Sequence, residues 1–453
     1  MSAVRRCLGV DIGTSSVKLF LSGDRPRLVR AGYARPGAEG VVEAIARGLR
    51  ELGDQVPLGA IDAIGLSGQT GTYYLVDDAG DVAHQVDWHA AGREEALARV
   101  LADIPQADFL RMTGMRHPRL ASYPLPTMAY LRGLGLPRGR LMQPKDYVVF
   151  RMAGEALSDA GSWRGLANPE SRDFDGELLA YAGWSRADLP RIAAHARVDA
   201  AGARLFGLRE GAELAVGMND FYAALYGMGV ASPGDCFDVT GTSEHLGVVV
   251  PSIVDSPLIV SPYLGRCVHY GVTASGGLAL SWAQRAFGPG RPDTVPAHAP
   301  LFLPYLRGER APVFDSAARG MFVGLTADTG AAALHYAVLE GVAFSICQVY
   351  DVLGRPPAAR VRATGGPSAD PLLNRLKASL LNAPIVAFEP NCGSALGAAA
   401  AAGGEWPSTE RVFEPEAALR PRLLERYALY ARMYGAWRDI AADADTGALF
   451  GGG

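Results

Sequence analysis

The sequence predicts a mixed α/β protein of two domains with duplicated halves. A chain of 453 residues is longer than a single hydrophobic core usually supports. Apolar runs of strand length alternate with segments whose apolar residues recur at helical spacing. One pattern also occurs twice, over residues 7–20 and 236–250: an apolar strand with an acidic residue, a Gly-Thr-Ser turn and a second apolar strand. The two turns are Gly13-Thr14-Ser15 and Gly241-Thr242-Ser243.

Composition excludes several classes of protein. Apolar residues make up 49% and charged residues 20% of the chain, which is typical of a soluble globular protein. The net charge of −4 offers no basic surface for nucleic acid. The first apolar run is broken by Asp11 and Gly13, so it predicts a strand and not a signal peptide. We expect a cytoplasmic protein without a membrane span, with five reduced, buried cysteines and a flexible tail at glycines 451–453.

In the first half, the predicted elements alternate between strand and helix. Strands are expected at residues 7–12, 16–22 and 27–33, a helix at 41–52 and a buried strand at 61–66. Residues 105–215 are richer in Pro, Arg and Gly. Helices are expected at 125–134 and 177–181 in this region and at 96–101 just before it. The region predicts an elaboration of the first domain that shapes a substrate pocket.

In the second half, the same order of elements begins again. We expect strands at 235–240, 245–250 and 267–273 and helices at 278–287, 330–353 and 371–381, with a short strand before residue 363. Glycines and a proline cluster at residues 227–235, which predicts the hinge. The domains are therefore expected at 1–228 and 229–453.

The repeated turn points to phosphate chemistry. Glycine lets a tight turn direct its N–H groups toward an anion, and hydroxyl groups add further donors. Two such hairpins facing each other could hold a polyphosphate. The chain has no Gly-Lys dipeptide, which excludes a P-loop, and no Gly-x-Gly-x-x-Gly between a strand and a helix, which disfavours a Rossmann site.

Five segments in order, spanning residues 8–400, resemble the FGGY family of carbohydrate kinases. They are the first hairpin at 9–15, a Gly-x-x-Asp stretch at 217–220, the second hairpin at 241–243, the distinctive run 303–325 continued at 339–344, and an adenosine-type segment from 363 to 399. The resemblance implies an actin-like, ribonuclease-H-like fold with a cleft between duplicated domains. It also implies that domain 1–228 binds the sugar and domain 229–453 the nucleotide.

The resemblance implies an ATP-dependent carbohydrate kinase. Asp220 would be the catalytic base that accepts the proton of the attacking hydroxyl, and Asp11 would orient hydrated Mg²⁺. The ATP-binding residues it implies are Gly13, Thr14, Ser15, Gly241, Thr242, Ser243, Gly276, Gly277, Gly365, Gly366 and Asp370, with Gly276 and Gly277 forming a turn. The substrate-binding residues it implies are Gln69, Thr70, Trp88, Asp220 and Phe221.

The sugar-binding positions depart from the family pattern. Thr70 and Gly71 stand where xylulose kinases usually have Met-His and glycerol kinases Arg-Glu. No Asp lies between Trp88 and Arg93, and Phe221 replaces the usual Asn or Gln. These changes remove hydrogen-bonding groups, and we expect them to alter substrate choice. The predicted substrate is a ketopentose such as D-xylulose, phosphorylated on a primary hydroxyl.

Several alternatives remain open at this stage. Asp11 could cap a turn, Asp220 could be the N-cap of a helix that starts at Phe221, and Glu309 with its neighbouring arginines could form a structural ion network. The substrate could be glycerol, erythritol or another polyol. The protein could also be an idle sensor of sugar or nucleotide, or an actin- or chaperone-like ATPase. The expected partners are a small sugar or polyol and ATP, and the family resemblance leaves a homodimer open.

Overall fold

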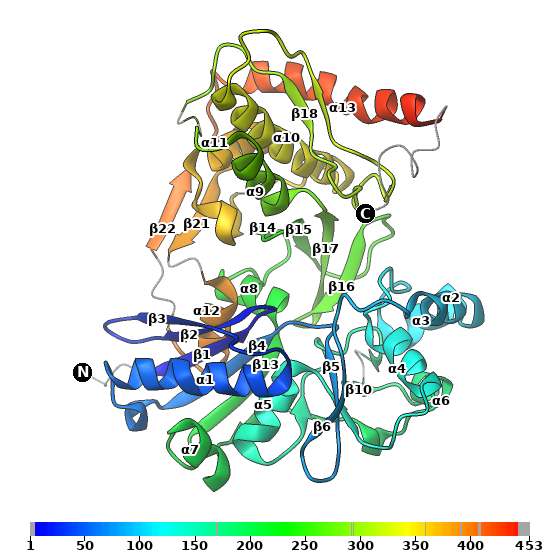
Figure 1. The fold of residues 1–453 in the computed structure, drawn as a ribbon, viewed down its shortest axis with the longest axis vertical. Helices are drawn as coiled ribbons and strands as arrows, with labels where there is room; N and C mark the ends of the chain where they lie inside the picture. The colour runs from blue at the N-terminus through cyan, green and yellow to red at the C-terminus, as the bar shows by residue number, and fades with distance from the viewer. Residues whose placement is uncertain are drawn as a thin grey trace. The chain divides into compact units, whose positions relative to one another are not determined.

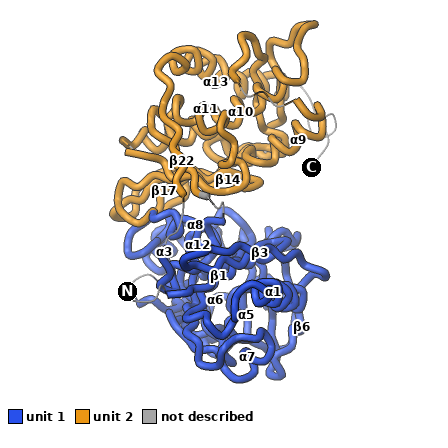
Figure 2. Tube along the Cα trace, turned by 90° about the vertical axis from the view of Figure 1, so that its left-hand side faces the viewer, with its two compact units in different colours: residues 1–229, 261–267, 392–408 blue, residues 230–260, 268–391, 409–453 orange. Residues whose placement is uncertain are grey.

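The computed structural model describes residues 5–168, 171–290, 292, 294–357, 359–389, 392–405 and 409–442. The chain forms two compact units, coloured separately in Figure 2. Unit 1 comprises residues 1–229, 261–267 and 392–408, and unit 2 comprises 230–260, 268–391 and 409–453. Two segments that follow residue 229 in sequence therefore belong to unit 1. The predicted tail at 451–453 lies outside the described residues.

Unit 1 is built around a six-stranded sheet (Figure 1). Across the sheet, the strands are β3 (Arg27–Gly32), β2 (Ser16–Leu21), β1 (Cys7–Ile12), β4 (Ala63–Gly68), β13 (Glu213–Asn219) and β12 (His195–Arg197). The central strands β1, β4 and β13 are parallel, and β1–β2 and β2–β3 are antiparallel. Their apolar residues form one core with α1 (Gly37–Gly53) and α5 (Pro144–Ala153).

The remaining elements of unit 1 surround this sheet. A second sheet holds β6 (Val82–Val86), β5 (Tyr73–Val76) and β7 (Arg140–Met142). The helices are α2 (Glu94–Asp103), α3 (Gln106–Thr113), α4 (Pro124–Gly133), α6 (Gly176–Ala182), α7 (Ala200–Phe206), α8 (Asp220–Gly227) and α12 (Gly393–Ala401). Short pieces are β8 (Leu157–Ser158), β9 (Ala167–Asn168), β10 (Asp173–Phe174), β11 (Arg191–Ile192), η1 (Leu58–Ala60) and η2 (Arg186–Asp188).

Unit 2 repeats the strand order of unit 1. Its sheet runs β16 (Ile259–Tyr263), β17 (Arg266–Thr273), β15 (Glu244–Val250), β14 (Cys236–Thr240), β20 (Val361–Thr364), β21 (Ile385–Glu389) and β22 (Thr409–Phe413). Strand β16 is an additional edge strand, and residues 261–267, from the end of β16 to the start of β17, are grouped with unit 1. Strands β14, β20 and β21 are parallel, while β15 and β22 are antiparallel to their neighbours. An antiparallel hairpin followed by two parallel strands thus occurs in both units, and the predicted duplication is confirmed.

Helices complete unit 2. They are α9 (Gly276–Phe287), α10 (Ala331–Val352), η3 (Gly366–Ala369), α11 (Pro371–Leu381) and α13 (Arg420–Ala442), beside a small sheet of β18 (Leu301–Leu303) and β19 (Met321–Val323). Among the described residues, α10 alone is long and apolar enough to cross a membrane, and 78% of its apolar window is buried inside the protein. It therefore packs as the central core helix of this unit.

The predicted elements agree with the structure, except for small shifts at their ends. The helix expected at 41–52 begins earlier, at Gly37, and the strand expected at 61–66 is β4 at Ala63–Gly68. The turn expected at Gly276 and Gly277 is the first turn of α9. The segment 395–399, grouped by sequence with the adenosine-type stretch, is part of α12 and belongs to unit 1.

Helix α12 packs unusually close to α8 and β1. A Cβ atom at Gly397 would lie 1.8 Å from the carbonyl oxygen of Ala223, and one at Gly9 would lie 1.9 Å from that of Ala395. Backbone oxygens cannot move aside as a flexible side chain can, so glycine is required at both positions. Because α12 contacts α8, it supports the helix whose first residue is Asp220.

We predict that Gly397→Ala lowers the free energy of unfolding by about 1–3 kcal/mol or more, because α12 must separate from α8. Gly435→Ala is the matched control, since no atom lies within 4 Å of its added methyl group. In the middle of α13 it should stabilise by about 0.5–1 kcal/mol. Urea denaturation of the three proteins measures both effects. Equal stability of the two variants would contradict the prediction.

Candidate active site

Asp11 lies near the carboxyl end of β1 and is buried. Its Oδ1 accepts a hydrogen bond from Ser67 Oγ at 3.0 Å, and its Oδ2 lies 3.1 Å from Lys18 Nζ. Both partners follow from strand register, because Asp11 stands opposite Lys18 on β2 and opposite Ser67 on β4. The carboxylate is therefore held in one orientation by charge and by hydrogen bonding.

Asp220 is the first residue of α8, directly after β13. The N-cap is Asn219, whose side chain accepts from Tyr222 N, so Asp220 itself is not the cap. Burial raises the pKa of Asp220 to about 6, and the charge of Asp11 adds to this increase. A carboxyl group poised near neutrality is suited to general base catalysis.

The first Gly-Thr-Ser turn joins β1 to β2. Gly13 N donates to Ser16 O at 3.0 Å and Gly13 O accepts from Tyr33 OH at 2.6 Å, so the turn is rigidly held. Thr14 and Ser15 are exposed at its tip. Thr14 Oγ1 donates to Gln69 Oε1 at 2.9 Å. This hydrogen bond joins a residue predicted to bind phosphate to a residue predicted to bind the sugar.

The loop that carries Trp88 is tied down by a buried arginine. Arg93 donates to the carbonyl oxygens of Trp88 at 2.7 Å and Asp87 at 2.8 Å, and to Thr127 Oγ1 at 3.3 Å. Burial lowers the pKa of Arg93. Trp88 is 44% exposed and is therefore available as an apolar platform for a ligand. Arg93 thus holds the loop that follows Trp88 by donating hydrogen bonds to backbone carbonyl oxygens.

Two further predicted substrate residues lie beside these groups in sequence and are half-buried. Thr70 follows Gln69 after the end of β4, and Phe221 follows Asp220 in α8. Phe221 N donates to Asp220 Oδ1 at 2.8 Å, and its ring lies 5.7 Å from that of Tyr222. The carboxyl ends of β1, β4 and β13 thus carry Asp11, predicted to orient the metal, Gln69, predicted to bind the sugar, and Asp220, the predicted base.

In unit 2, the second Gly-Thr-Ser turn is pinned by the start of α9. Gly241 N donates to Ser243 O at 2.8 Å, which closes the turn. Gly241 O accepts from Gly277 N at 2.8 Å, and Thr242 O accepts from Leu278 N at 3.0 Å. A Cβ atom at Gly277 would lie 2.5 Å from Gly241 O, and one at Gly276 would lie 3.0 Å from the carbonyl carbon of Ser243. These glycines therefore permit the contact between turn and helix.

A hollow of about 1080 Å³ adjoins this turn within unit 2. Its lining includes Gly241, Thr242, Gly277, Gly366 and Asp370 of the predicted ATP-binding residues, together with Gln284 and Arg285 of α9. Gly365, with φ of +105°, brings η3 against the turn, because a Cβ atom there would lie 1.9 Å from Thr240 O. Asp370 Oδ1 accepts from Leu373 N at 2.9 Å and so caps α11.

Glu309, in the distinctive run 303–325, supports the start of α9. Its buried carboxylate accepts from Ala274 N at 2.5 Å, Ser275 Oγ at 2.6 Å and Ser345 Oγ at 3.3 Å. Burial raises the pKa of Glu309, and these hydrogen bonds oppose the increase. Glu309 accepts from backbone N–H groups and serine hydroxyls, so this residue acts by holding the loop before α9.

Lys377 of α11 lies beneath the second hairpin. Its amine is 2.6 Å from Asp238 Oδ2 on β14 and also contacts Glu244 on β15, and all three side chains are buried. Thr240 Oγ1 donates to Asp238 Oδ1 at 2.8 Å. Burial and the charge of Asp238 raise the pKa of Glu244, although Lys377 opposes them. The triad joins both strands of the hairpin to α11, whose N-terminus lines the hollow.

We predict that Lys377→Met lowers the free energy of unfolding by about 3–5 kcal/mol at neutral pH, because two buried carboxylates lose their cation. The loss should shrink in acid, where the carboxylates take up protons. Arg375→Met on the same helix is the control, since it breaks a more exposed pair with Glu416 and should cost no more than about 1 kcal/mol. Denaturation at two pH values measures this, and equal losses for both variants would contradict it.

Sequence reasoning missed the partners of these groups. Lys18, Ser67, Asn219 and the Lys377 triad are recognised only from register and tertiary contacts. One signal was available: three lysines, Lys18, Lys145 and Lys377, stand among 43 basic residues. Each contacts carboxylates in the structure, and two of them are buried.

Comparison with known proteins identifies a family. Residues 239–406 match the C-terminal domain of the FGGY family of carbohydrate kinases. The resemblance identified in the sequence is thereby confirmed. The two-domain, actin-like fold is confirmed by solved sugar-kinase structures that cover nearly the whole chain. The protein is a phosphotransferase with an alcohol group as the acceptor.

Similar proteins carry several sugar-kinase names. A xylulose kinase from Lactococcus lactis is 25% identical over 487 residues, covering 96% of each chain. A gluconokinase from Bacillus subtilis is 23% identical over 448 residues, covering 86% of each. A solved structure of a "xyloylose kinase" from Brucella ovis is 28% identical, with a TM-score of 0.82, and covers 96% of this chain and 99% of that one.

Proposed function

We propose that this protein transfers the γ-phosphate of ATP to a primary hydroxyl of a ketopentose such as D-xylulose. The observation that carries the proposal is the paired arrangement of Asp11 and Asp220 at the carboxyl ends of parallel strands, with the pKa of Asp220 raised to about 6. Full-length similarity to xylulose kinases supports the ketopentose as the first substrate to test.

Asp220 acts as the base in this proposal. Its carboxylate accepts the proton of the substrate hydroxyl as that oxygen attacks the γ-phosphorus. The P–O bond to the β-phosphate breaks, and ADP leaves with its electron pair. Gln69, Thr70, Trp88 and Phe221 position the sugar beside this carboxylate. Phe221 offers apolar surface where an Asn or Gln is usual in the family, and no Asp lies between Trp88 and Arg93, so we expect a changed preference among sugars.

The nucleotide is held by the glycine-rich turns. In this proposal, Thr14 and Ser15 from the first hairpin and Thr242 and Ser243 from the second contact the phosphates, with Gly13 and Gly241 shaping the turns. The hollow beside Gly277 and Gly366 accepts the adenosine. At about 1080 Å³ it is large enough for a nucleoside, because ligand pockets typically measure about 300–1,000 Å³.

A divalent cation fits the residues around Asp11. Two neighbouring carboxylates, Asp11 and Asp220, concentrate negative charge, and a site with few protein ligands is the usual one for Mg²⁺ bound to phosphates. Asp11 would hold the hydrated ion, which would neutralise charge on the phosphate oxygens. Within the described residues, no group of three or more His, Cys, Asp or Glu side chains forms a ready-made metal cage.

Asp220→Asn should lower kcat by about 10²–10⁴-fold, because the amide cannot accept the proton. ATP affinity should be retained. Asp199→Asn is the control, since Asp199 also stands at a helix N-terminus in unit 1 and the change preserves its cap. ADP release is measured over a panel of ketopentoses, aldonates and polyols. Full activity of Asp220→Asn would exclude this base.

The pH profile tests the same residue. Because Asp220 must be unprotonated and its pKa is raised to about 6, kcat/KM should rise as pH increases through about 6 and fall about tenfold per unit below it. The measurement is kcat/KM for the preferred sugar in overlapping buffers. A profile that stays flat well below this value would contradict the assignment.

The substrate panel also separates the alternatives. Preferred turnover of glycerol or erythritol would make the protein a polyol kinase. Nucleotide binding without turnover of any sugar would indicate a sensor. ATP hydrolysis stimulated by a protein partner and indifferent to sugars would indicate an actin- or chaperone-like ATPase.

A further inference from the structure

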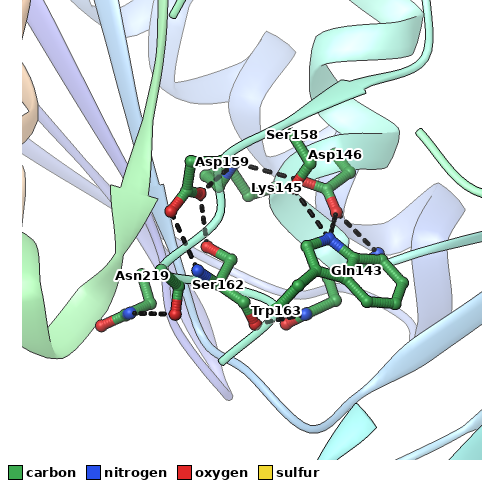
Figure 3. A network of polar contacts seen from close by, with 9 residues as sticks. Gln143, Lys145, Asp146, Ser158, Asp159, Ser162, Trp163 and Asn219 are labelled. Carbon is green, nitrogen blue, oxygen red and sulfur yellow. Dashed lines mark hydrogen bonds and ion pairs between the residues drawn. The ribbon is translucent and has the colours of Figure 1, made fainter. Parts of the chain in front are cut away.

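A buried ionic network lies beside the strand ends of unit 1. Lys145, at the start of α5, places its Nζ 3.0 Å from Asp146 Oδ1 and 3.1 Å from Asp159 Oδ2 (Figure 3). Lys145 and Asp146 are buried. Burial favours loss of the lysine proton, but the two carboxylates reverse this effect and raise the pKa of Lys145. The lysine is therefore charged and held between two acids.

The network continues into the loop after β8. Asp159 Oδ1 accepts from Ser162 N at 2.9 Å, and Asp159 Oδ2 accepts from Ser162 Oγ at 2.6 Å. The indole of Trp163 donates to Asp146 Oδ2 at 3.1 Å, and Gln143 Nε2 donates to Ser162 O at 2.7 Å. Figure 3 shows these contacts, which tie the loop 159–163 to the start of α5.

This loop holds the residue that starts α8. Asn219 Nδ2 donates to the carbonyl oxygen of Gly161 at 3.1 Å, and Asn219 Oδ1 accepts from Tyr222 N at 2.8 Å. One amide side chain thus joins the loop to the helix. Its position sets where the backbone leaves β13 and where Asp220, the next residue, points.

The stem of Lys145 packs on the strand ends themselves. A Cβ atom at Gly68 would lie 3.0 Å from Lys145 Cβ. Gly68 stands between Ile12 of β1 and Asn219 of β13 in the register of the sheet. Asp11, Gln69 and Asp220 are each one residue from this row. Lys145 therefore packs against the strand ends that carry the residues predicted to bind the metal, bind the sugar and act as the base.

We propose that Lys145 is a positioning residue for the reaction. Its ammonium group holds the loop 159–163, the Gly161 carbonyl holds Asn219, and Asn219 fixes the start of the helix that bears Asp220. The role rests on the proposed function, because it acts through the base. A lysine suits this place because its slender stem fits against Gly68 while its amine reaches two carboxylates.

Two variants interrupt the chain of contacts at different points. Lys145→Met removes the charge but keeps the stem. Asn219→Ser keeps a good helix cap but cannot reach Gly161. Each should lower kcat by about tenfold to a hundredfold, with smaller changes in KM for sugar and ATP, because small misplacement of a reacting group is costly. The double variant should lose little more than the worse single one, since both act through one path.

Arg151→Met is the matched control on the same helix. Arg151 contacts Tyr147 OH at 2.8 Å and Glu39 at 3.3 Å, and it takes no part in the network. Its kcat should stay within about twofold of the native value. Melting curves confirm that the compared variants are folded. If Lys145→Met does not fold, kcat and hydrogen exchange are measured on Asp159→Asn and Asn219→Ser in its place.

Hydrogen exchange provides a readout that needs no activity. The amides at residues 219–223 should exchange faster in Lys145→Met and in Asn219→Ser than in the native protein, and Arg151→Met should leave them unchanged. Unchanged exchange, or a folded Lys145→Met with native kcat, would overturn the proposal. Absence of sugar-dependent turnover in the native protein would instead overturn the proposed function, and exchange would still decide the role of Lys145.

Discussion

The structure of unit 1 depends on the register of three parallel strands. Ile12, Gly68 and Asn219 stand side by side across β1, β4 and β13. Because parallel strands end at the same edge of a sheet, this row brings together residues that are far apart in sequence. Asp11, Gln69 and Asp220 gather there for that reason. A slip of one residue in any strand would turn its side chains to the opposite face.

Like charges at one edge need compensation, and the chain supplies it with lysine. Burial and the charge of Asp11 raise the pKa of Asp220, whereas Lys18 opposes that effect and contacts Asp11 directly. In unit 2, Lys377 contacts the acidic side chains of Asp238 and Glu244, on the two strands that flank the second turn. In both units, a lysine contacts a carboxylate on the strand that precedes a Gly-Thr-Ser turn. Each contact helps to hold a turn that is proposed to bind phosphate. A mobile turn would have to become ordered when phosphate binds, and that ordering would weaken binding.

The second hairpin is shaped by close backbone contacts as well as by charge. Gly277 and Gly365 let α9 and η3 approach the turn from two sides, at distances that a side chain would prevent. Glu309 then holds the loop before α9 through Ala274 N and Ser275 Oγ. This explains one function of the distinctive run 303–325. The sequence left open that Glu309 belongs to an ion network. In the structure, its carboxylate orders the backbone beside the hollow.

The sequence alone was enough to predict the class of fold, the duplicated hairpins and the order of most elements, because these depend on local periodicity and on turn residues such as Gly13 and Gly241. It also indicated kinase chemistry, since its motifs occur in family order. Only the tertiary structure decided that Asn219, and not Asp220, caps α8, that segment 395–399 joins unit 1, and that Lys145 and Lys377 each hold two carboxylates. These features depend on contacts between residues far apart in the chain, and no local pattern encodes which distant atom comes to lie within 3 Å.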